Sequence, residues 1–598
     1  MAGKTTADAA EFRVACASDA DPVSEAAARD LAEALAAMLD RPCVMAPSED
    51  TPRATLRIVA PAEFGDRAPI DIVAPPGMNL LNAVWEYLER LGAKLPVGRP
   101  ARLPHLAPER LFAVPPSATA PAFARRAFAA DLMTWHYEHP ERFAAHLEHD
   151  REFVPWMAAR GINAFSWIRH ERDSRLKIDE LIPAMRLRGI APEYGGHVLQ
   201  LLMPRDAYES HPDYFPLGAD GARNPRGNLC ASNAAAIAIV CEGALAWASA
   251  NPDCVMLHLW GADVHGGAWC RCAGCAALGP HRQYLAVVNA VADALAARGI
   301  AIPVAYLAYH DTLEPDPALA PRANVFVEWA PRERCYSHAI DDAACGANRR
   351  YFDSLRKYFD LFGGRMRVFE YYADAILFGG LAIATPAVIA RDLRAYHAVG
   401  VREISCLTFG AYSSLAYPLN LEIFARCARS LEYAPGAVFA DVAAAFHPAC
   451  ASAMAAAYRA LADASALLLD GGGPVMRPQT DGPGASVRAA ALAAAAGRIE
   501  RAIAAADAIS TALASRLGAA ERAVWQYSRE VVQGLAEYLA AAGESAPERA
   551  RRGAAAIARI ADAVRHVREI DERYKGTWGA HDFEWAREKW LAAMRRNL

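Results

Sequence analysis

The chain has 598 residues and a formal net charge of −5, so it is too long for one hydrophobic core and lacks the basic character of a nucleic-acid-binding protein. No apolar run approaches the roughly 18 residues of a membrane span, and residues 1–21 have no signal-peptide core. The 13 cysteines are odd in number and scattered, which fits reduced thiols in the cytoplasm. We therefore expect a cytoplasmic, multidomain protein with no membrane or nucleic-acid partner.

Residues 1–115 predict a small α/β domain. Three segments have the composition of strands, and two have apolar residues at helical spacing with a capping serine or a terminal glycine. The expected strands are 12–18, 54–60 and 70–76, and the expected helices are 24–40 and 79–95. None of these segments contains a catalytic pattern, so we assign the domain an accessory role.

Residues 116–430 alternate apolar runs with helical patterns. Such alternation predicts parallel strands joined by helical crossovers, and eight runs predict a (β/α)8 barrel of the TIM type. The eight runs are Ala127–Trp135, Ala164–His170, Ile190–Gly196, Val255–Ala262, Val304–His310, Val325–Ala330, Arg367–Tyr372 and Glu403–Phe409. Residues 431–598 are rich in alanine and predict a C-terminal α-helical domain, interrupted by a Gly/Pro-rich linker at 470–486. The expected fold class is therefore α/β, with a barrel between two further domains.

Polar and aromatic side chains are concentrated at the ends of the predicted strands, where barrel enzymes place their active sites. Aromatic faces combined with hydrogen-bonding groups suit a sugar, so we expect a carbohydrate substrate. Two glycines before His197 would let the backbone approach a ligand closely, whereas His258 lies inside a strand and is expected in the core. The predicted substrate-binding residues are Trp135, Arg169, His170, Glu193, His197, Trp260, His265, Tyr309, His310, Trp329, Tyr371 and Tyr372.

Six motifs give the chain a resemblance to a known group of proteins. They are EYGGH at 193–197, HPDYF at 211–215, NLCASN at 228–233, the Asp263 loop with its three cysteines, RCYSHAIDDAACGAN at 334–348 and FEYYAD at 369–374. On these motifs the chain resembles the domain of unknown function 4838 family, which is related to α-glucuronidases and β-hexosaminidases. The resemblance implies a glycoside-hydrolase-like fold and fixes neither the substrate nor the catalytic pair.

Three carboxylates are candidates for the pair that glycoside hydrolysis requires. Asp263 follows the fourth strand, Glu328 lies in the sixth and Glu370 in the seventh. We expect Asp263 to act with Glu370, from nearly the opposite side of the barrel, with Glu328 as the reserve partner. Asp263 is expected to donate a proton, with its pKa raised by aromatic residues that exclude water. The alternative for either glutamate is a buried ion pair with a strand arginine such as Arg169 or Arg367.

Three cysteines form a Cys-x-Cys-x-x-Cys cluster beside the predicted active site, at Cys270, Cys272 and Cys275. Thiolates at this spacing could bind a structural zinc ion, with a fourth ligand from Cys230, His265 or Cys335. The alternatives are reduced thiols or a disulfide that closes the loop. The predicted reaction itself requires no cofactor.

The sequence thus predicts a glycoside hydrolase that acts on an oligosaccharide or glycoconjugate at the C-terminal face of the barrel. Arginines near the strand ends favour an acidic sugar, such as a uronic or sialic acid, because guanidinium groups bind carboxylates bidentately. These arginines are Arg126, Arg169, Arg172, Arg332 and Arg334. A neutral or N-acetylated sugar, a non-catalytic carbohydrate-binding barrel, a zinc-dependent hydrolase of another bond and a homo-oligomeric state all stay open.

Overall fold

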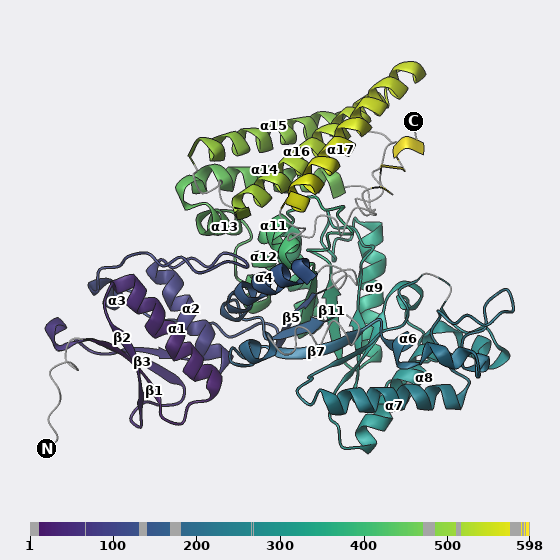
Figure 1. Ribbon diagram of the computed structural model, residues 1–598, viewed down its shortest axis with the longest axis horizontal. Coiled ribbons are helices and arrows are strands. Elements are labelled where there is room, and N and C mark those ends of the chain that lie inside the picture. Colours follow the sequence, from purple (N-terminus) through teal and green to yellow (C-terminus); the bar gives the residue numbers. More distant parts are fainter. Residues whose placement is uncertain are drawn as a thin grey trace.

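The computed structural model describes residues 11–65, 67–130, 140–167, 181–264, 266, 268–469, 485–509, 516–573, 588, 591–592 and 594–596. It contains a small N-terminal sheet with helices, a closed barrel and a C-terminal layer of long helices (Figure 1). This is the α/β architecture that the sequence predicts, while the domain limits near 115 and 430 stay predictions. Within the described ranges, no helix is both long and apolar enough to cross a bilayer.

The N-terminal region is a four-stranded mixed sheet in the order β2-β1-β3-β4, packed against helices. β1 pairs in parallel with β2 and antiparallel with β3, which pairs antiparallel with β4. The elements are β1 (Phe12–Ala17), α1 (Pro22–Leu39), β2 (Cys43–Ser48), β3 (Thr55–Val59), β4 (Ile70–Val73), α2 (Met78–Leu91) and α3 (Glu109–Ala113). The predicted strands and helices are all present, but the prediction missed β2. This edge strand contains a proline and has no fully buried side chain, so it lacks the apolar signal of the others.

Eight parallel strands form the closed barrel, with the last strand paired to the first. Each strand overlaps one of the eight predicted runs. The strands are β5 (Arg125–Ala130), β6 (Ala164–Trp167), β7 (Ala191–Gly196), β8 (Leu257–Leu259), β9 (Val304–Ala308), β10 (Val325–Trp329), β11 (Met366–Glu370) and β12 (Glu403–Thr408). The helices between and after them are α4 (Pro140–Ala159), α6 (Leu199–Leu202), α7 (Ala234–Ala250), α8 (Ala273–Ala297), α9 (Gly346–Leu361), α10 (Pro386–Val399), α11 (Gly410–Ala416) and α12 (Pro418–Arg429). Because the strands are parallel, their C-terminal ends meet on one face, which we call the mouth.

Local signals and ion pairs fix how these parts begin, end and join. Asp21 caps α1 by accepting two backbone N–H hydrogen bonds of 3.0 Å, and α2 ends at Gly92 with a left-handed φ of +112°. Glu89 of α2 pairs at 2.8 Å with both Arg160, just after α4, and Arg426 of α12. These contacts attach the N-terminal region to the helices outside the barrel.

The C-terminal helices pack on one another in chain order and also touch the barrel (Figure 1). They are α13 (Val438–Phe446), α14 (Ala451–Leu469), α15 (Ala485–Ile509), α16 (Arg516–Ala541) and α17 (Ala546–Arg573). The loop after β11 meets α16, because the Ala382 N–H donates to Ser528 Oγ at 3.0 Å and the Tyr527 hydroxyl donates to the Gly379 carbonyl at 2.8 Å. The helical region therefore lies against the mouth side of the barrel. Residues 470–484 of the predicted linker lie outside the described residues.

Candidate active site and metal centre

Asp263 lies in the loop that follows β8, and 59% of its side chain is exposed. The loop is anchored at both ends. The Ala262 N–H donates to Oδ1 of the buried Asn228 at 2.8 Å, and the Gly266 N–H donates to both carboxylate oxygens of Asp311 at 2.9 and 3.1 Å. Asp263 is thus a carboxylate held open to solvent at the mouth, as its place after the fourth strand predicts.

Two imidazoles and a guanidinium group surround the Asp263 carboxylate. His310 Nε2 lies 3.6 Å from Asp263 Oδ1, and its backbone has an unusual φ of +48°. Desolvation raises the pKa of Asp263, but the contact with His310 and the electrostatic interactions with His197 and Arg332 outweigh it and hold the pKa below its usual range. The expectation of a raised pKa is therefore wrong, because His310, His197 and Arg332 lower the pKa of Asp263 by more than burial raises it.

Aromatic rings line the same region. The His197 ring meets Trp260 edge-on at 5.2 Å between centroids, and its Nδ1 lies 2.5 Å from the Gly261 carbonyl oxygen. The ring of Tyr371 lies under the Arg332 guanidinium at 5.9 Å. The structure therefore brings six of the predicted site residues to the mouth. They are Asp263, His197, Trp260, Tyr309, His310 and Tyr371.

Three residues at the mouth were not among the predicted site residues. Arg332 follows β10, and its Nε lies 2.9 Å from Oδ2 of Asp374, which follows β11 and is fully buried. Glu333 is exposed and follows Arg332 in the chain, and its charge raises the pKa of the Tyr309 hydroxyl, as the charge of Asp263 does. Burial raises the pKa of Tyr309, and these carboxylates raise it further. Arg332 was singled out in the sequence only as a cation, and an exposed loop glutamate such as Glu333 gives no sequence signal.

Two predicted residues, Glu193 and Glu328, face the barrel interior instead of the mouth. Glu193 receives two hydrogen bonds from the Arg367 guanidinium, at 2.5 and 2.8 Å. Glu328 Oε2 accepts a hydrogen bond from Trp260 Nε1 at 2.8 Å and lies 2.8 Å from His258 Nδ1. Both carboxylates have no exposed surface. They belong to a charged layer inside the barrel, which agrees with the expectation that His258 is a core histidine.

Glu370, Trp329 and Tyr372 point outward from the barrel strands. Glu370 accepts a hydrogen bond from the Tyr396 hydroxyl on α10 and lies 3.2 Å from Arg334 Nε. The indole of Trp329 donates to Ser354 on α9, and the Tyr372 hydroxyl donates to Asp392 on α10. These contacts lie between the strands and the helices that cover them. The structure therefore does not bring Glu328 or Glu370 beside Asp263, and their catalytic roles stay predictions.

Four other predicted site residues, Trp135, Arg169, His170 and His265, lie outside the described residues. The first glycine of EYGGH, Gly195, has a packing role that the sequence does not reveal. A Cβ on Gly195 would lie 2.1 Å from the His258 carbonyl oxygen. Gly195 therefore lets β7 approach β8 closely, rather than letting a ligand approach the backbone.

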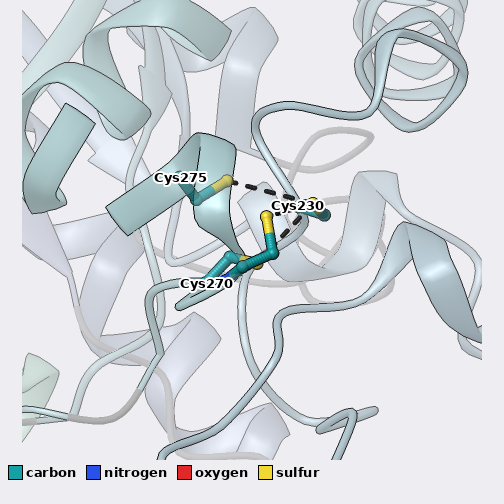
Figure 2. A group of neighbouring side chains, drawn as sticks. Cys230, Cys270 and Cys275 are labelled. Carbon is teal, nitrogen blue, oxygen red and sulfur yellow. Dashed lines mark hydrogen bonds between the residues drawn. The ribbon is translucent and has the colours of Figure 1, made fainter. Parts of the chain in front are cut away.

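The predicted cysteine cluster is completed by Cys230, which comes from the NLCASN motif. The sulfurs of Cys230, Cys270 and Cys275 point toward one another (Figure 2). The ligand atoms of these three and Cys272 lie within 4.8 Å of one another, and Cys230 Sγ lies 3.6, 3.7 and 3.9 Å from the sulfurs of Cys270, Cys272 and Cys275. Zinc–thiolate bonds of about 2.3 Å place tetrahedral ligands about 3.8 Å apart, whereas a disulfide needs about 2.05 Å. The four-cysteine cluster could therefore hold a metal ion.

Backbone hydrogen bonds further support a metal at this place. The N–H groups of Leu217 and Cys272 donate to Cys270 Sγ at 3.3 and 3.5 Å, as suits a sulfur that carries negative charge. Of the three fourth ligands considered, the structure favours Cys230, because Cys335 lies in a different group and His265 lies outside the described residues. No disulfide forms among the cysteines.

Comparisons with known proteins place the barrel in a wider context. Residues 119–408 match the family model described as a domain of unknown function, DUF4838. The match covers the barrel and agrees with the resemblance to this family, whereas the resemblance to α-glucuronidases and β-hexosaminidases stays a prediction. Among solved structures, the chain is similar to a GH138 enzyme targeting pectin rhamnogalacturonan II, with a TM-score of 0.57, 10% sequence identity and coverage of 94% of this chain and 74% of that one. At this identity the likeness shows the fold alone. The chain has no significant match among curated proteins.

Proposed function

We propose that the chain is a glycoside hydrolase whose reaction takes place around Asp263. The observation that carries this proposal is a solvent-exposed carboxylate at the mouth, flanked by His197, His310 and Arg332 and lined by aromatic rings. Aromatic faces beside charged hydrogen-bonding groups suit a sugar ring. The likeness in fold to a GH138 enzyme supports the same reaction class.

Asp263 acts in this proposal as an ionised base or nucleophile. Its lowered pKa keeps the carboxylate charged at neutral pH, which suits attack on the sugar or activation of a water molecule. The second carboxyl group is Glu333, because it is exposed on the loop after β10 and its charge, like that of Asp263, raises the pKa of Tyr309. Glu333 would give its proton to the leaving oxygen.

Glu328 and Glu370 are the competing partners for Asp263, as the sequence suggests. Their contacts support structural roles, since each is fully buried, Glu328 against His258 and Trp260 and Glu370 against Tyr396 on α10. A catalytic role for either would require substrate to reach a carboxylate that has no exposed surface in this structure.

The substrate is proposed to carry an acidic sugar, such as a uronic or sialic acid. Three cationic or titratable nitrogen-bearing side chains, His197, His310 and Arg332, gather around Asp263. A carboxylate on the substrate would find a guanidinium partner in Arg332, which also pairs with Asp374. A neutral or N-acetylated sugar is the competing outcome of the test below.

The test is a panel of aryl glycosides, including uronides, sialosides and N-acetylated sugars, with purified wild type and amide variants. Asp263→Asn and Glu333→Gln should each lower kcat by two or more orders of magnitude without loss of fold. Glu314→Gln, another exposed glutamate on a mouth-side loop, is the matched control and should keep wild-type activity. If Glu328→Gln or Glu370→Gln abolishes turnover in a folded protein while Glu333→Gln does not, the proposed pair is wrong. Sugar binding without turnover would instead identify a binding barrel.

The four-cysteine cluster is proposed to hold a structural zinc ion that supports this site. It joins the loop before α7 to the loop that carries Asp263, and four thiolates leave no open coordination position. Metal analysis should find about one equivalent of zinc at this cluster, and Cys272→Ser should release it. Cys241→Ser, at a half-buried cysteine outside the cluster, should not. Unchanged metal content in Cys272→Ser would refute zinc at this cluster, and turnover that depends on an added metal would favour a metal-dependent hydrolase.

A further inference from the structure

A second group of metal-binding side chains lies in the loop between β10 and α9. It consists of Cys335, His338 and Cys345, whose ligand atoms all lie within 4.8 Å of one another. Cys335 Sγ is 3.2 Å from His338 Nδ1, and the Ser337 hydroxyl lies 3.1 and 3.0 Å from these two atoms. Cys335 is buried, while His338 and Cys345 are half-buried. The group is separate from the four-cysteine cluster.

The loop that carries these ligands is held in shape by buried polar side chains. Asn348, which has no exposed surface, accepts from the Cys335 N–H and donates to the carbonyls of Cys335 and His338, all at 2.9 Å. The equally buried Asp392 accepts from the Ile340 N–H at 2.6 Å. A buried amide and a buried carboxylate that satisfy loop backbone in this way fix where the thiol and the imidazole point. The donor atoms are therefore preorganised before any ligand arrives.

We propose that Cys335, His338 and Cys345 bind a second zinc ion, with a fourth coordination position open to water. Two thiolates and one imidazole are a donor set that zinc prefers over hard cations such as magnesium and calcium. Binding would release the two thiol protons to solvent and leave the imidazole neutral, with no change of oxidation state. Three protein ligands with one position left for water are the pattern of an open zinc site. Half-buried His338 and Cys345 give that position a route to solvent.

The ligands of this ion lie close in sequence to two residues of the mouth. Arg332 and Glu333 precede Cys335 by three and two residues, and Cys345 is the N-cap residue directly before α9. Zinc would thus join the loop that carries Arg332 and Glu333 to the start of a barrel helix. The proposal concerns metal binding alone and does not depend on glycoside hydrolysis.

The experiment measures zinc by elemental analysis in full-length protein purified without chelator. His338→Asn and Cys345→Ser should each lose about one equivalent relative to wild type, and the half-buried Cys241→Ser should lose none. The Cys272→Ser background removes the contribution of the four-cysteine cluster. In that background, cobalt(II) added to metal-stripped protein should give the visible absorption of a tetrahedral thiolate site, and Cys345→Ser should abolish it.

Equal zinc content in wild type, His338→Asn and Cys345→Ser would overturn the proposal. So would a disulfide between Cys335 and Cys345 in protein isolated without reductant, since oxidised sulfurs cannot act as thiolate ligands. The cobalt titration of the Cys272→Ser protein keeps the wild-type loop intact, so the absence of a thiolate–cobalt signal there would also overturn the proposal, even if substitutions in the loop impair folding.

Discussion

His258 should make the stability of the barrel depend on pH in the alkaline range. Burial lowers the pKa of this imidazole, but the carboxylates of Glu328 and Glu193 outweigh it and raise the pKa from 6.5 to about 9. A group whose pKa is higher in the folded state stabilises that state fully below its unfolded value, and the contribution is lost as pH rises through the folded value. At about 1.4 kcal/mol per pKa unit, this contribution is about 3 kcal/mol at pH 6 and is lost by about pH 10.

The assay is urea unfolding of wild type and His258→Gln at a series of pH values from 6 to 10. The variant should be less stable at pH 6, and its disadvantage should shrink by about 3 kcal/mol as the imidazolium of the wild type loses its proton. His211→Gln, at an exposed histidine, is the control and should run parallel to wild type. NMR titration of histidine-labelled wild type gives the same pKa without substitution. Parallel curves for wild type and His258→Gln, or a His258 resonance that titrates near pH 6.5, would refute the reasoning.

Two further substitutions test the packing of the barrel interior. Glu193→Gln should lower the free energy of unfolding by about 3–5 kcal/mol, because it leaves the fully buried Arg367 without its main partner. Glu403→Gln, on the more exposed side of the same arginine, should lower it less, and equal urea midpoints for the two variants would contradict this assignment. Gly195→Ala should prevent soluble expression, because its Cβ would lie 2.1 Å from the His258 carbonyl oxygen. The control is Gly221→Ala, which has a positive φ but open space around it and should express as soluble protein. A soluble, cooperatively folding Gly195→Ala protein would show that β7 and β8 can separate.

The strands of the barrel could be predicted because burial on both faces makes them continuous apolar runs. The same property hides which side chains face inward. Glu328 and Glu370 lie in neighbouring strands, yet the first points into the barrel and the second toward α10. In a strand with one solvent-exposed face, alternation of polar and apolar residues would reveal which side chains point inward. Here only the hydrogen-bond partners reveal it, so the sequence could propose acids but could not sort them.

The candidate site was predictable where a residue followed a strand directly. Tyr309 and His310 come directly after β9 and Asp263 lies four residues after the end of β8, and the structure places all three together at the mouth. The fourth cysteine was harder to choose, since Cys230 precedes Cys270 by 40 residues and no spacing rule links them. Glu333 gives no signal at all, because an exposed acid on a loop is usually a solvated surface group.

Buried polar side chains outside the strands hold the backbone of the loops at the mouth. Each of three loops has its own buried anchor away from the strands: Asn228 for the loop of Asp263, Asn348 for the loop after β10, and Ser528 of α16 for the loop after β11. The charged layer of Glu193, His258, Glu328 and Arg367 is held together by its own hydrogen bonds inside the barrel. The residues that stabilise the interior are therefore different from those proposed to react with substrate. A substitution in the interior should change unfolding far more than substrate preference, and a substitution in an anchor should do the reverse.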